Sequence, residues 1–262
     1  MNPTLASHFQ ALNENGWTIL PERLPAELVD AVVAQLPAAL AKRDAIRQAN
    51  GQTDNTDGTI HHFLIDHACN LEVLKALQPY DGLIGEFFGG KYIVNSYGGL
   101  INRQGAKAYV HNVHRDIRFF APTRRFMLNI LVMLDDFTLE NGATHLLSGS
   151  HLHADKPDDQ HFYQHSARAL GQRGSLLLFD SRLWHATGDN HTAALRRALT
   201  ITLTSPFFKQ QLDYPRALAS QPQARDDAYL RQITGYNARV PSTLEEFYVP
   251  LEQRFYQRGQ DE

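Results

Sequence analysis

Hydrophobic residues in the first part of the chain recur at the spacing of a helix. Within residues 5–47, Val32 and Leu36 lie four positions apart on one helical face, and similar pairs flank them. We therefore expect helical structure over 5–47, in which Pro37 predicts a kink or a break. The polar segment "ANGQTDNTDGTIHH" (49–62) predicts a loop.

The pattern changes after a predicted pair of helices at 70–90, which Gly89 and Gly90 should end. From residue 91 the chain contains short segments rich in β-formers, such as "KYIVNSYGGLI", "RRFMLNILVML" and "GSLLLFDSRLWHA", with turn-forming residues between them. In "LTITLT" apolar residues alternate with threonines, so one face of a strand is apolar and the other carries hydroxyls. We expect an antiparallel sandwich or barrel after the helices, and a covering segment of helix and loop after Pro206.

Length and composition fit one globular domain over residues 1–262, because 43% of the 262 residues are hydrophobic and 20% are charged. The domain would have a helical part (1–90), a β core (91–208) and a C-terminal covering segment (209–262). A net charge of −3 argues against a nucleic-acid partner. The single cysteine, Cys69, suits a reducing compartment. Without a signal-peptide pattern or a membrane-spanning apolar run, we expect a cytoplasmic protein that is not bound to a membrane.

Two His-x-Asp triplets are candidate metal ligands. With 13 histidines in the chain, about one such triplet is expected by chance, so context must separate them. His114 and Asp116 lead into "IRFF", which favours a strand with both side chains on one face. His153 and Asp155, here named the loop triplet, lie in the polar stretch "GSHLHADKPDDQ" and are interpreted as solvated residues.

His185, in "LFDSRLWHATGDN", is the best candidate for a third ligand, although it could also be a turn histidine bonded to backbone. Two histidines and a carboxylate suit non-haem Fe(II), because they leave coordination positions open for other molecules. The same set can also hold zinc in a hydrolase.

A chelating dicarboxylate would need a fixed cation, and Arg196 and Arg197 begin the strand that follows His185. Arg196 shares its face with the small and hydroxyl residues of that strand, whereas Arg197 shares its face with Leu199. We therefore assign the cation to Arg196, and we expect Arg197 to be an ordinary surface residue at a strand end.

The ordered motifs over residues 91–208 resemble the phytanoyl-CoA dioxygenase family of Fe(II)- and 2-oxoglutarate-dependent oxygenases. The motifs are the first His-x-Asp, the turn "NGATHLLSGSH" (141–151), the distal His185, and Arg196 eleven residues later. "LNENGWTILPERLPAELVDAV" and "GYNARVPSTLEEFYVP" resemble the two ends of such chains.

The resemblance implies a mainly β fold with flanking helices, built as a cupin-like double-stranded β-helix, or jelly roll, around the iron. His114, Asp116 and His185 would bind Fe(II), and Arg196 and Thr187 would contact 2-oxoglutarate. The enzyme would be a dioxygenase that uses dioxygen to hydroxylate a small molecule of specialised metabolism, with desaturation or ring closure as other outcomes. In halogenating relatives a small residue replaces the carboxylate ligand, and this chain keeps Asp116.

Two further residues are candidate cosubstrate contacts. His111 stands where relatives often have a glutamine that helps to hold 2-oxoglutarate, and it could donate the same bond, become an unwanted ligand, or only pack. Asn129 lies within an apolar strand and must find polar partners, which could be backbone alone. A metal-dependent hydrolase and an inactive small-molecule binding module remain alternative functions.

The substrate is not readable from the sequence. Four arginines close to the first triplet either meet an anionic substrate or are solvated and paired with acids such as Asp135 and Asp136. They are Arg115, Arg118, Arg124 and Arg125.

Overall fold

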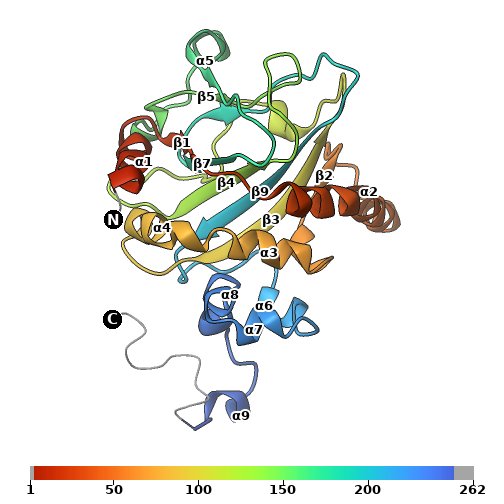
Figure 1. Ribbon diagram of the computed structural model, residues 1–262, viewed down its shortest axis with the longest axis vertical. Coiled ribbons are helices and arrows are strands. Elements are labelled where there is room, and N and C mark those ends of the chain that lie inside the picture. Colours follow the sequence, from red (N-terminus) through yellow and green to blue (C-terminus); the bar gives the residue numbers. More distant parts are fainter. Residues whose placement is uncertain (1–2, 251–262) are drawn as a thin grey trace.

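Two antiparallel sheets form the centre of the molecule in the computed structural model, which describes residues 3–250 (Figure 1). The larger sheet has the strand order β1-β7-β4-β9-β3-β2, and the smaller sheet has the order β6-β5-β8. The strands are β1 (Trp17–Ile19), β2 (Thr59–Ile60), β3 (Ile93–Asn102), β4 (Met127–Met133), β5 (His145–Leu146), β6 (Ala167–Arg168), β7 (Leu176–Asp180), β8 (His185–Ala186) and β9 (Arg196–Thr204). Within the described residues the sheets do not close into a barrel, so the predicted jelly roll is open.

The α-helices are α1 (Pro3–Glu14), α2 (Ala26–Ala49), α3 (Cys69–Lys75), α4 (Asp81–Phe88), α5 (Asp159–His165), α6 (Tyr214–Ala217), α7 (Gln223–Asp226), α8 (Ala228–Ile233) and α9 (Leu244–Phe247). Short 3₁₀ helices are η1 (Phe63–Ile65), η2 (Gln78–Tyr80), η3 (Tyr109–His111), η4 (Ser150–Leu152) and η5 (Tyr236–Ala238). Helices α2, α3 and α4 cover the face of the larger sheet that points away from the smaller sheet, whereas α5 lies beside β5 of the smaller sheet (Figure 1). Figure 1 shows α4, α3 and α2 following one another along the larger sheet, with α6–α8 beyond them. No helix within residues 3–250 combines the length and the apolar character that crossing a bilayer requires.

The two faces of β9 have different surroundings, as the alternating pattern predicts. Leu199, Ile201 and Leu203 are fully buried in the main core, together with residues of α2, α3 and α4. Each such side chain contributes roughly 1.5–3 kcal/mol by leaving water. On the opposite face, Ala198 joins a second apolar cluster between the two sheets. The sheet therefore holds the helices with one face and presents the other to the interior of the jelly roll.

Two expectations for the N-terminal part need correction. The segment 5–47 is not continuous helix, because β1 lies between α1 and α2 and pairs with β7. Of the kink or break expected at Pro37, the break is wrong, because α2 runs from Ala26 to Ala49 with Pro37 inside it. The buried residues of α2 pack against the core on both sides of Pro37, and this packing outweighs the lost hydrogen bond.

The pair of helices predicted over 70–90 is confirmed as α3 and α4, and Gly89 ends α4 with a left-handed φ of 67°. The covering segment predicted for the C-terminus contains α6–α9 within the described residues, and its last part, 251–262, lies outside them.

The predicted Asn-Gly turn brings the smaller sheet close to the segment after His185. Gly142 has a φ of +84°, and a Cβ on it would lie 2.2 Å from the carbonyl oxygen of Gly188. Only glycine fits this conformation and this contact. The turn therefore sets the position of the strand β5 that follows it.

Candidate metal centre and cosubstrate pocket

The three predicted metal ligands lie together in the fold. One ligand atom from each of His114, Asp116 and His185 lies within 4.8 Å of the other two. Asp116 stands between the histidines, with Oδ1 3.4 Å from His114 Nε2 and Oδ2 3.7 Å from His185 Nε2. Reciprocal backbone hydrogen bonds join the two histidines, from His114 N to His185 O (3.0 Å) and from His185 N to His114 O (2.9 Å).

The expected strand at the first triplet is wrong. His114 forms an isolated bridge with His185, and Asp116 follows in a bend. The backbone N–H groups of Asp116 and Ile117 both donate to Ser181 O, at 3.1 and 3.3 Å, which turns the chain away from strand geometry. His185 likewise begins the short strand β8 instead of ending an apolar one. The ligands converge because two loops pair here, not because one strand carries two of them.

Backbone carbonyls orient both imidazoles. His114 Nδ1 lies 2.7 Å from Asn112 O, and His185 Nδ1 lies 2.9 Å from Leu183 O. A carbonyl oxygen only accepts, so each Nδ1 donates its proton to the carbonyl and each Nε2 faces Asp116. Metal-binding histidines have this arrangement, in which an outer carbonyl fixes the tautomer and the ring orientation.

Charge and burial keep the ligand groups ready for a cation. Burial and the neighbouring His114 lower the pKa of His185 to about 4, so this ring is neutral near pH 7. Burial lowers the pKa of His114, but the hydrogen bond that the protonated ring donates to Asp116 and the charge of this carboxylate outweigh burial and raise the pKa overall. Burial raises the pKa of Asp116, yet His185 and His114 bring it down to about 2. The Asp116 carboxylate is therefore ionised, and a bound cation would neutralise it.

Asn129 on β4 holds this carboxylate in place. Its Nδ2 donates to Asp116 Oδ2 (2.5 Å) and to Ser181 Oγ (3.2 Å), while its Oδ1 accepts from Thr202 Oγ (2.9 Å). The sequence suggested Asn129 as a cosubstrate contact. Its amide is instead occupied by protein groups, so we treat it as a residue that positions Asp116.

The three ligands line a cavity of about 360 Å³ at the inner face of the larger sheet. Leu131, Phe179 and Ala198 form an apolar part of its wall, and Thr200 and Thr202 contribute hydroxyls. A larger cavity of about 1230 Å³ lies elsewhere, and none of the three ligands lines it. The smaller cavity is the candidate active site, because its wall contains the groups that can carry chemistry.

Arg196 begins β9, lies on the cavity-facing side of this strand, and is fully buried. Its Nε, Nη1 and Nη2 atoms have no hydrogen-bond partner among the described residues, and its guanidinium lies 4.7 Å from the centre of the Phe137 ring. Burial lowers the pKa of Arg196 to about 9, which leaves it charged near pH 7. A buried cation without a partner is costly. The site therefore fits a missing oxyanion, such as one end of a dicarboxylate.

Other buried polar atoms without a partner among the described residues lie near Arg196 or on residues that line the cavity. Asn102 pairs with Arg196 across β3 and β9, and its Oδ1 has no partner among the described residues. The same holds for His111 Nε2 and Thr144 Oγ, and the charge of Arg196 contributes to the lowered pKa of His111. Thr187, whose role rested on the resemblance, also lines the cavity.

The sequence reasoning missed Asn102 and Thr144. Thr144 is 3% exposed and lies in the quoted motif "NGATHLLSGSH", so this motif was the available signal. Asn102 directly follows the predicted strand "KYIVNSYGGLI" (91–101) and becomes notable only through its pairing with Arg196.

His111 can donate a hydrogen bond toward this region. Its Nδ1 lies 3.0 Å from the backbone N of Ala108 and 3.1 Å from Ala108 O, so it can accept from the N–H or donate to the carbonyl, and in the first case the proton of the neutral ring lies on Nε2. Burial lowers the pKa of His111, which favours the neutral form. The buried Nε2–H can then serve a carboxylate, as a glutamine amide would.

Arg197 points to the other face of β9, where its guanidinium contacts Asp135 at 2.9 and 2.5 Å. Asp135 therefore does not pair with the four arginines near the first triplet, contrary to one expectation. Asp136 accepts from the backbone N–H of Arg173 and also pairs with none of them. The loop triplet lies in an exposed segment, as expected.

The chain is similar to known oxygenases over most of its length. The sequence pattern of the family described as phytanoyl-CoA dioxygenase (PhyH) matches residues 12–198. An uncharacterized protein, Rv1501 of Mycobacterium tuberculosis, is 39% identical over 133 residues, which cover 51% of this chain and 49% of that protein. The match thus spans about half the length of that relative. The dioxygenase trt7 of Aspergillus terreus is 30% identical over 212 residues, which cover 74% of this chain and 71% of the relative.

A similar fold occurs in a solved structure, that of the non-heme alpha ketoglutarate dependent epimerase SnoN from nogalamycin biosynthesis. Its TM-score is 0.58 at 17% identity, and the match covers 77% of this chain and 81% of that chain. At this identity the likeness concerns the fold, and it agrees with the two-sheet arrangement of the jelly roll.

Proposed function

Because this chain belongs to the phytanoyl-CoA dioxygenase family, we propose that it is an Fe(II)- and 2-oxoglutarate-dependent oxygenase that hydroxylates a small molecule of specialised metabolism. The names of trt7 and SnoN support the class of reaction and the metabolic setting. The observation that carries the proposal is the buried, unpartnered guanidinium of Arg196 on the same sheet face as the three-ligand cluster. A metal hydrolase would have no use for this cation.

Different residues bind the metal and the cosubstrate. His114, Asp116 and His185 hold the metal, with their Nε2 and carboxylate atoms preset by backbone carbonyls and by Asn129. Bound Fe(II), with 2-oxoglutarate and dioxygen, would supply the oxidising chemistry that replaces a C–H hydrogen of the substrate by a hydroxyl group. Arg196 pairs with the carboxylate of 2-oxoglutarate that is remote from the metal.

Neutral donors and apolar residues complete the pocket. The Nε2–H of His111 and the hydroxyls of Thr144 and Thr187 can donate to cosubstrate oxygens. Leu131 and Phe179 exclude water from the reacting atoms, which limits side reactions. In the overall reaction, substrate, 2-oxoglutarate and dioxygen give hydroxylated substrate, succinate and carbon dioxide. The carboxylate of Asp116 occupies the ligand place that a halide takes in halogenating relatives, which favours hydroxylation.

An anaerobic titration tests the proposal. Adding 2-oxoglutarate to the protein with Fe(II) should produce a weak visible charge-transfer band, because the cosubstrate binds iron through its keto acid end. Admitting dioxygen should then convert 2-oxoglutarate to succinate, at a low rate even without substrate. A hydrolase or an inactive binding module would give neither signal, and their absence with metal bound would reject the function.

A further inference from the structure

Arg118 lines the same cavity as the candidate metal ligands, and it is the only lysine or arginine among the described residues that line it. Its guanidinium makes no hydrogen bond and no ion pair with any residue in the described range 3–250. The Arg124 side chain, which lines the larger cavity, likewise makes no hydrogen bond or ion pair within the described residues, whereas Arg115 and Arg125 are engaged. The guanidinium of Arg115 lies 4.8 Å from the centre of the Trp184 ring and donates to Ala154 O, and Arg125 donates to Asn13. Arg118 thus has a charge that the protein itself does not use.

When metal and 2-oxoglutarate are bound, the charge of Arg118 is the one among the described residues of the site that no other group balances. Among the described residues that line the cavity, Asp116 is the only acid. A divalent metal with Asp116, and a dicarboxylate with Arg196, together sum to zero charge. The positive charge of Arg118 then remains without compensation. An uncompensated charge in the lining of a cleft attracts anions and raises their local concentration.

The part of the cavity wall formed by residues 59–62 adds no competing charge. It includes His61 and His62. Burial is the main cause that lowers the pKa of both rings, and the charge of nearby arginines lowers it further. Both rings are therefore neutral near pH 7 and can act only as hydrogen-bonding groups. His62 is also the only non-glycine residue with a positive φ, 53°, in the described backbone.

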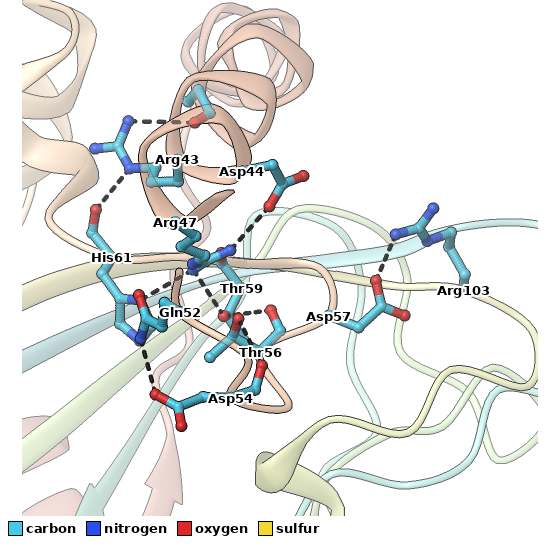
Figure 2. A network of polar contacts seen from close by, with 11 residues as sticks. Arg43, Asp44, Arg47, Gln52, Asp54, Thr56, Asp57, Thr59, His61 and Arg103 are labelled. Carbon is cyan, nitrogen blue, oxygen red and sulfur yellow. Dashed lines mark hydrogen bonds and ion pairs between the residues drawn. The ribbon is translucent and has the colours of Figure 1, made fainter. Parts of the chain in front are cut away.

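The arginines behind this wall are engaged in holding it. Arg43 donates from Nε to His61 O (2.8 Å), and its Nη1 lies 2.5 Å from Asp66. Arg47 donates to Thr59 O (2.8 Å) and pairs with its helix neighbour Asp44 (3.0 Å). Figure 2 shows both arginines reaching from the end of α2 to the backbone of the wall. Their charges are satisfied there, so among the described residues that line the cavity Arg118 is the cation without a protein partner.

We propose that the substrate is a small organic anion whose carboxylate or phosphate group pairs with Arg118, which leaves an uncharged carbon to face the metal ligands. The inference rests on the proposed function and adds the substrate class. The planar fork of arginine matches either oxyanion with two parallel hydrogen bonds. The neutral donors and acceptors of His61, His62 and the cavity threonines would then contact uncharged polar groups of the same molecule.

Binding of fluorinated probes tests the proposal without knowledge of the natural substrate. The protein is loaded with Zn(II), which is redox-inert, and with saturating ¹³C-labelled 2-oxoglutarate, which keeps probes away from Arg196. Fluoroacetate, 4-fluorobenzoate and 4-fluorophenylphosphonate are titrated and followed by ¹⁹F NMR. Fluoroacetamide is the neutral counterpart of fluoroacetate, and 4-fluorobenzamide is the neutral counterpart of both aromatic anions. At least one anion should bind about fivefold more tightly than its neutral counterpart, as expected for one partly solvated charge pair.

Variants assign the preference to one side chain. Arg118→Gln should remove the preference for anions, and Arg118→Lys should keep part of it. Arg124→Gln is the matched control, because Arg124 lies in the same segment but lines the larger cavity. Arg118 is exposed, so the variants should fold, which thermal melting verifies.

Two results would overturn the proposal: no preference for anions in the unmutated protein, or the same preference in Arg118→Gln. A failure of the proposed function is seen separately, because the ¹³C signals would then show that 2-oxoglutarate does not bind.

Discussion

Replacing Arg196 by methionine should have two effects of opposite sign. The guanidinium is fully buried, and none of its three nitrogens has a partner among the described residues, so the cosubstrate-free protein bears the cost of a desolvated charge. Its pKa of about 9 lies above neutral pH, and the cost is therefore present in full near pH 7. Methionine removes this charge and should stabilise the cosubstrate-free protein by about 1–4 kcal/mol, less what the contact with the Phe137 ring contributes.

The same change should weaken binding of 2-oxoglutarate. One carboxylate of the cosubstrate would be left unpaired in a closed site, which costs about 2–5 kcal/mol and corresponds to roughly a 30-fold to several-thousandfold loss of affinity. Anaerobic titration of the Fe(II) protein with 2-oxoglutarate measures the affinity through the visible band. Denaturant unfolding without metal or cosubstrate measures the stability. Iron binding should persist, because Arg196 is not a metal ligand.

Arg197→Met is the control. Arg197 is 26% exposed in its side chain and pairs with Asp135 on the other face of β9. Its loss should lower stability by about 1 kcal/mol or less and leave 2-oxoglutarate affinity unchanged. Equal effects of the two variants on affinity would refute the assignment of the faces. A loss of stability in Arg196→Met would refute the argument from an unpaired buried cation.

Four further predictions concern the metal, the pocket and the product. Alanine at any one of the three candidate metal ligands should abolish iron retention after desalting. Alanine at both His153 and Asp155 of the loop triplet should leave iron retention unchanged. Iron retained by Asp116→Ala would contradict the ligand set. Asn129→Leu should weaken iron binding about tenfold to a hundredfold in a metal titration, because the Asp116 carboxylate loses its donor, and unchanged affinity would remove this positioning role. His111→Gln should keep the affinity for 2-oxoglutarate and His111→Leu should lower it about tenfold, as for one lost hydrogen bond; equal affinities would mean that His111 only packs. With ¹⁸O₂ and excess chloride, mass spectrometry should find a product with one labelled oxygen and no chlorine, and a chlorinated product would argue against Asp116 as a ligand.

The periodic signals of the sequence determined the faces of its elements. Alternation along "LTITLT" separates the apolar and hydroxyl faces of β9, and it puts Arg196 and Arg197 on opposite sides of the sheet. The Asn-Gly dipeptide likewise predicts the left-handed turn at Gly142. Such features depend on the geometry of a few consecutive residues, so the local sequence is enough to predict them. The strand β1, only three residues long, gave no periodic signal and was missed.

Only the tertiary structure decided which groups meet. Asp116 faces two imidazoles because the loops of His114 and His185 pair, and no spacing within one strand could have shown this. The amide of Asn129 turns to Asp116, because β4 lies between β7 and β9 in the sheet. Of the arginines near the first triplet, Arg118 enters the cavity of the candidate ligands and Arg124 the larger one, although they lie six residues apart in one segment. Each of these outcomes depends on sheet register and on the path of loops between distant segments, which local sequence patterns do not contain.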